Sequence, residues 1–122
     1  MTERMSAAHM RQVGTADAAF ERELVQEKAS ALGRLGRQLE VALAALAAFE
    51  AAHSQIPLSP AGRCRRDGLI NEAASCVWNL AVQREACGLR DDGGMMNDFG
   101  VPAEVRQRAG LVVVSLHRRL RA

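Results

Sequence analysis

The stretch LGRLGRQLEVALAALAAF, residues 32–49, decides the fold. Large apolar side chains recur in it at intervals of three and four residues: Leu32, Leu35, Leu39, Leu43, Leu46 and Phe49. This spacing places apolar side chains on one face of an α-helix. Phe20 and Leu24 carry the pattern toward the N-terminus. We therefore expect a helix from about residue 17 to residue 52.

Two glycines, Gly33 and Gly36, lie inside this helix. Each costs a helix about 1 kcal/mol relative to alanine. Either the helix breaks there, or a neighbouring helix packs closely over a small-residue stripe of Ala29, Gly33 and Gly36. The leucine register is the same on both sides of the glycines, which favours the unbroken helix.

A second helix follows the interruption at residues 53–60. Ser59 is a good N-cap, Pro60 suits the first helical position, and Gly88 is well placed after a helix that ends near Cys87. Its apolar residues form two faces: Ile70, Ala73, Val77, Leu80 and Cys87 on one, and Ala74, Trp78 and Ala81 on the other. A helix that is apolar around most of its circumference belongs in the middle of a structure. The two helices predict a long antiparallel helical hairpin.

The C-terminal part predicts one or two short helices. Residues 95–99 can form a helical turn that ends at Gly100, and Pro102 can start another helix that Gly110 ends or bends. Residues 111–122 are ambiguous, because their three consecutive valines suit a strand but no second strand is available to pair with them. A helix is favoured there, and the fold class is all-α.

Length and composition indicate one small domain that needs a partner. The chain has 122 residues, which we divide into a disordered tail, residues 1–16, and a single helical domain, residues 17–122. Alanine supplies much of the apolar content, and it buries little area, so such a chain packs weakly alone. We expect a homodimer, a four-helix bundle formed by two hairpins through one face of the second helix: Ala74, Trp78, Ala81 and Glu85.

No pattern typical of catalysis or metal binding is visible. The three histidines lie far apart, and the three cysteines form no CxxC pair. The longest apolar run, residues 41–49, is too short to span a bilayer. We expect no enzyme activity, no cofactor, no metal and no membrane span, and we expect reduced cysteines in a cytoplasmic protein.

The C-terminal arginines offer an alternative function. Residues 102–121 have the outline of a helix-turn-helix, and their positive charge comes from five arginines: Arg106, Arg108, Arg118, Arg119 and Arg121. Against DNA recognition, Arg106 stands where the motif wants a small residue and Arg119 stands where it wants an apolar one. The net charge of +2 also argues against a dedicated polyanion binder.

One ion pair is predicted from the hairpin. If the chain turns near residue 56, Arg84 falls on the inner face of the second helix, and its nearest acid across the pair is Glu27. An unpaired charge on an inner face is expensive. We expect a buried or half-buried Glu27–Arg84 pair; the alternative is that Arg84 extends to solvent.

Three stretches, residues 27–34, 82–91 and 98–105, resemble segments of a family of small bacterial proteins classed as a domain of unknown function. The resemblance covers residues 17–110. It implies a bacterial, cytoplasmic, helical protein and carries no activity or cofactor. The sequence therefore favours a non-catalytic helical protein that self-associates and serves protein–protein interaction, with weak nucleic-acid binding as the alternative.

Overall fold

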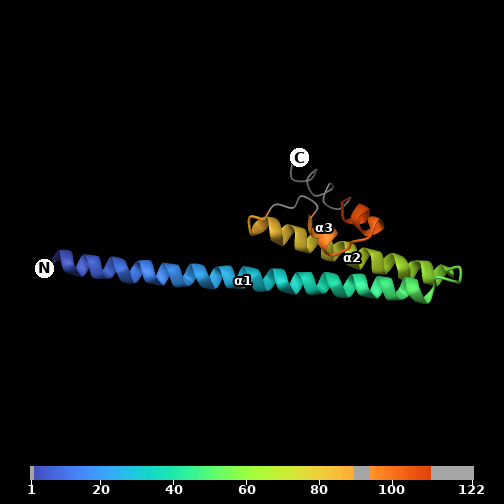
Figure 1. Cartoon of the computed structure of the whole chain (residues 1–122), viewed down its shortest axis with the longest axis horizontal. Helices are drawn as coiled ribbons and strands as arrows, with labels where there is room; N and C mark the ends of the chain where they lie inside the picture. Colours follow the sequence, from blue (N-terminus) through green and yellow to red (C-terminus); the bar gives the residue numbers. More distant parts are fainter. Residues whose placement is uncertain (1, 90–93, 111–122) are drawn as a thin grey trace. The chain divides into compact units, whose positions relative to one another are not determined.

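The computed structural model describes residues 2–89 and 94–110, with side chains for residues 14–89 and 94–110. Three helices have defined bounds: α1 (Thr2–Ala52), α2 (Pro60–Ala86) and α3 (Gly94–Asp98). A further helical segment covers residues 103–110 and is called the 103–110 helix. The described residues contain no strand, so the all-α prediction is confirmed. Figure 1 shows α2 running back beside the C-terminal part of α1, which confirms the antiparallel hairpin.

Helix α1 begins earlier than expected. It starts at Thr2, whereas the sequence pattern led us to expect a start near residue 17 after a disordered tail. Residues 2–13 lack apolar periodicity but contain mostly good helix formers and no proline. Local propensity can therefore extend a helix that is already nucleated further along the chain. The chain divides into two units, residues 1–31 and residues 32–122, and each is described by itself.

The ends of α2 are those that the sequence predicts. The Ser59 hydroxyl accepts a hydrogen bond from the Gly62 N–H at 3.1 Å, and Pro60 opens the helix. At the other end Gly88 has a φ of 80°, and the Leu89 N–H donates to the Arg84 carbonyl at 2.9 Å. This is a Schellman motif, in which a glycine in the left-handed region lets the chain satisfy the last carbonyls of the helix.

The core of residues 32–110 is formed by α1, α2 and the segment after α3. The fully buried large side chains are Leu39 on α1, Ile70 and Val77 on α2, and Val105 on the 103–110 helix. α2 alone contributes six buried residues: Ile70, Ala73, Ala74, Cys76, Val77 and Leu80. Both of its predicted apolar faces therefore contribute to one core.

The helix α1 continues through both glycines, so the expectation of an unbroken helix is confirmed. A Cβ atom at Gly36 would lie 3.3 Å from the Phe99 ring, whereas one at Gly33 would meet only the Arg37 side chain of the same helix. Of the two glycines, only Gly36 is closely approached by another part of the chain. The approaching group is the Phe99 side chain, and not a neighbouring helix as expected. The sequence therefore predicted correctly that a small residue is needed at Gly36, but the expectation that a neighbouring helix packs against it was wrong.

The glycines give a stability prediction. Gly68 lies inside α2, and a Cβ atom added to it would meet nothing within 4 Å, so Gly68→Ala should raise the free energy of unfolding. The gain expected from helix propensity is about 0.5–1 kcal/mol. Gly36→Ala should gain clearly less or lose stability, because Phe99 must move. Urea denaturation of both variants checks this; equal gains would contradict the role of Phe99 at Gly36.

Candidate functional site

The four residues predicted to form a dimer face differ in how deeply they are buried within the chain. Ala74 is buried in the core, Trp78 and Ala81 are half-buried, and Glu85 is exposed. The indole Nε1 of Trp78 is buried and has no hydrogen-bond partner among the described residues. Part of this face is thus already covered within the chain, and its use as a dimer interface stays a prediction.

The arginines of the nucleic-acid alternative are described only in part. Arg106 donates from Nε to the Val101 carbonyl at 2.8 Å and from Nη2 to Asn97 Oδ1 at 3.0 Å. Arg108 donates from Nη1 to Asp67 Oδ1 at 2.7 Å and to Asn71 Oδ1 at 2.9 Å. Arg106 thus binds the residues just before the 103–110 helix, and Arg108 links that helix to α2. Three further candidates, Arg118, Arg119 and Arg121, lie outside the described residues, as does the ambiguous stretch 111–122, and nucleic-acid binding stays a prediction.

An arginine that the sequence analysis did not single out joins three helices. Arg66 on α2 donates two parallel hydrogen bonds to the Glu104 carboxylate, at 3.0 Å and 2.6 Å, and a third to Glu50 at the end of α1, at 2.9 Å. A planar guanidinium suits this forked geometry. These three residues lie far apart in the sequence, so no local pattern could have predicted the cluster.

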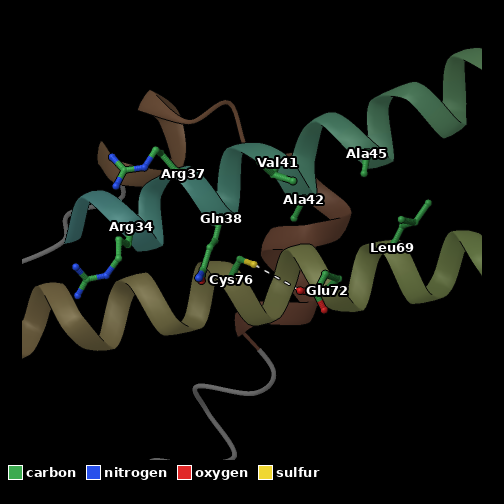
Figure 2. A pocket seen from close by; sticks show the side chains of 9 residues that line it. All are labelled: Arg34, Arg37, Gln38, Val41, Ala42, Ala45, Leu69, Glu72 and Cys76. Atoms are coloured by element: carbon green, nitrogen blue, oxygen red, sulfur yellow. Dashed lines mark hydrogen bonds between the residues drawn. The ribbon is translucent and has the colours of Figure 1, made fainter. Parts of the chain in front are cut away.

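A groove of about 700 Å³ lies between α1 and α2 (Figure 2). Its apolar lining comes from both helices: Val41, Ala42 and Ala45 from α1, and Leu69 and Cys76 from α2. Four polar side chains complete it: Arg34, Arg37, Gln38 and Glu72. Val41 is 70% exposed at its edge. The groove was not predicted, because it depends on small alanines of α1 facing α2 and not on any motif.

The cysteine in this groove is a poor nucleophile. The Cys76 thiol is within 4.0 Å of Glu72 Oε1, and burial, with the Glu72 charge second, raises the pKa of the thiol. A thiol with a raised pKa stays protonated at neutral pH and behaves as a small apolar group. The Cys76 thiol therefore adds to the apolar lining of the groove.

Neither a metal-ion site nor a membrane span is found in the described part of the chain. Its residues bring no three or more His, Cys, Asp and Glu side chains into a group that could hold a metal ion. No helix among them is both long enough and apolar enough to cross a membrane.

Comparison with protein families matches residues 3–118 to a family of unknown function, DUF6665. This confirms the resemblance noted in the sequence and extends it beyond residues 17–110 on both sides. Neither the curated proteins nor the solved structures that were searched contain a match.

The Arg66 cluster predicts how stability depends on pH. The hydrogen bonds from Arg66 hold the pKa of Glu104 below its ordinary value of 4.5. A lowered pKa means that the pair stabilises the fold above about pH 4.5 and that this contribution is lost as the pH falls further. Arg66→Met should cost about 1 kcal/mol at pH 7, the upper range for an exposed pair, and progressively less from pH 5 to pH 3.

The matched control for this prediction is Arg65→Met, which removes an exposed arginine beside Arg66 in the same helix. Its effect on the free energy of unfolding should be small and should change little with pH. If the two variants showed the same pH dependence in urea denaturation, the Arg66–Glu104 pair would not be the cause.

The Glu27–Arg84 pair remains a prediction from the sequence. Arg84 is half-buried, and its Nε atom is buried without a hydrogen-bond partner in the described part of the chain. A double-mutant cycle with Glu27→Gln and Arg84→Met should give a coupling energy above about 0.5 kcal/mol, the level of an exposed pair. A smaller coupling would mean that Arg84 extends to solvent.

Proposed function

The chain belongs to DUF6665, a family of unknown function, and from that premise we propose that it is a non-catalytic helical protein that self-associates and serves protein–protein interaction. The proposal includes a cytoplasmic location in a bacterium. All three cysteines are unpaired, which supports a reducing compartment.

One observation carries the proposal: large apolar side chains are exposed on the N-terminal part of α1. Every residue from 14 to 30 is exposed. Phe20 is 66% exposed, Leu24 45% and Val25 65%. Phe20 and Leu24, one helical turn apart, form an apolar surface that water solvates poorly, and burying each would contribute about 1.5–3 kcal/mol.

The two long helices differ in length. Helix α1 has 51 residues and α2 has 27. At the standard rise these correspond to about 77 Å and about 40 Å. Isolated helical stretches are only marginally stable in water, and most helices in proteins are stabilised by packing of an apolar face. A partner that covers Phe20 and Leu24 would provide that packing.

Of the two parts of the proposed function, self-association can be measured directly on the purified chain. Light scattering at micromolar concentration should give a mass of twice 13.2 kDa. The double variant Phe20→Gln, Leu24→Gln should raise the dimer dissociation constant by more than about tenfold, because it removes two apolar contacts.

Ile56→Gln is the matched control, since Ile56 is 67% exposed in the turn between α1 and α2. It removes a similar exposed apolar side chain and should leave the dissociation constant unchanged. A mass near 13.2 kDa at every concentration would contradict the proposal.

A further inference from the structure

We propose that the groove between α1 and α2 binds residues 20–31 of α1 from a second copy of the chain, with the two α1 helices antiparallel. This inference rests on the self-association proposed above and names the two surfaces that meet. One surface is the exposed apolar stretch around Phe20 and Leu24, and the other is the groove lined by Val41, Ala45 and Leu69.

The groove has the shape that a helix with large side chains requires. Ala42 and Ala45 are small, and between the larger Val41 and Leu69 they leave about 700 Å³ of space. In Figure 2, Val41 and Ala45 lie along α1 and Leu69 rises from α2, so the hollow is bounded by apolar groups from two helices. Helices associate when a large side chain of one enters a hollow between side chains of another.

The spacing of residues along α1 gives the register of the pair. The positions 20, 24, 27, 31, 34, 38, 41 and 45 alternate in steps of four and three, which is the core spacing of a coiled coil. Phe20 and Leu24 thus belong to the same heptad series as Arg34, Gln38, Val41 and Ala45, the α1 residues of the groove.

In an antiparallel pair, the numbers of facing residues add up to a constant. If this sum is 65, Phe20 lies opposite Ala45 of the other copy and Leu24 lies opposite Val41 of the other copy. The large aromatic ring of each copy then faces a small alanine in the groove of the other. The same register repeats across the two-fold axis, so both grooves are filled and the assembly closes as a dimer.

Charge favours the antiparallel arrangement over the parallel one. Residues 17–28 contain four acids and two bases, Asp17, Glu21, Glu23 and Glu27 against Arg22 and Lys28, a net charge of −2. In the antiparallel register described above, residues 17–28 of one copy face residues 37–48 of the other, which contain Arg37 and Glu40 and carry no net charge. A parallel pair would place like charges together, which is destabilising.

A photo-crosslink at the position of Phe20 tests the arrangement directly. Phe20→benzoylphenylalanine keeps an aromatic side chain, and a mixture of ¹⁵N-labelled and unlabelled chains identifies crosslinks between copies by mass. We expect intermolecular crosslinks to residues 41–45 of α1 or to residues 69–76 of α2.

The outcomes separate this inference from the proposed function. A dimer whose crosslinks join residues 16–24 of both copies is parallel and overturns the groove inference alone. A dimer without crosslinks to the groove overturns it as well. A chain that stays monomeric in light scattering overturns both.

A pair of alanine substitutions tests the groove without a chemical probe. Ala45 lies in the groove, and Ala47 is likewise an exposed alanine but lies outside the heptad series. Ala45→Gln should raise the dimer dissociation constant by at least about tenfold, because it fills the space that Phe20 needs. Ala47→Gln should change it less than about twofold. Equal effects of the two variants, at unchanged helix content, would overturn the inference.

Discussion

The structure depends on α2 being packed on two sides at once. On one side, α2 faces α1, and Leu69 and Cys76 line the groove between these two helices. On another side, α2 faces the 103–110 helix, and Arg108 of that helix donates hydrogen bonds to Asp67 and Asn71 of α2. Its buried residues are small or medium-sized, apart from Ile70 and Leu80. Such a helix gains little from one neighbour and needs a second. The Arg66 cluster, which contacts Glu50 on α1 and Glu104 on the 103–110 helix, fixes both neighbours at the same end of α2.

That arrangement leaves α1 with unused apolar surface. α2 and the C-terminal segment bury Leu39, Ala42 and Leu46 of α1, while Phe20, Leu24 and Val41 stay exposed. The groove beside Val41 and the stretch around Phe20 are two incomplete packing surfaces. A second copy supplies what each of them lacks, which unites the proposed self-association with its proposed geometry.

Much of the fold could be predicted because its signals are local. The Ser59 cap, Pro60 and Gly88 set the bounds of α2, and the three-and-four spacing of leucines set the buried face of α1. The N-terminal start of α1 could not be predicted from periodicity, because residues 2–13 follow helix propensity without an apolar face. The contact of Phe99 with Gly36 and the Arg66–Glu104 pair join residues distant in sequence, and a single sequence shows no trace of such pairs.

The proposed assembly requires that a second copy covers residues 20–31 of α1. Amide hydrogen exchange measured as a function of protein concentration tests this most directly, because a covered helix exchanges slowly and a solvated one opens readily. We expect amides of residues 20–31 to gain protection as the concentration rises through the dissociation constant, while those of residues 70–80 in the core of each copy stay protected throughout. Exchange of residues 20–31 at the same fast rate in dilute and concentrated solution would contradict the assembly.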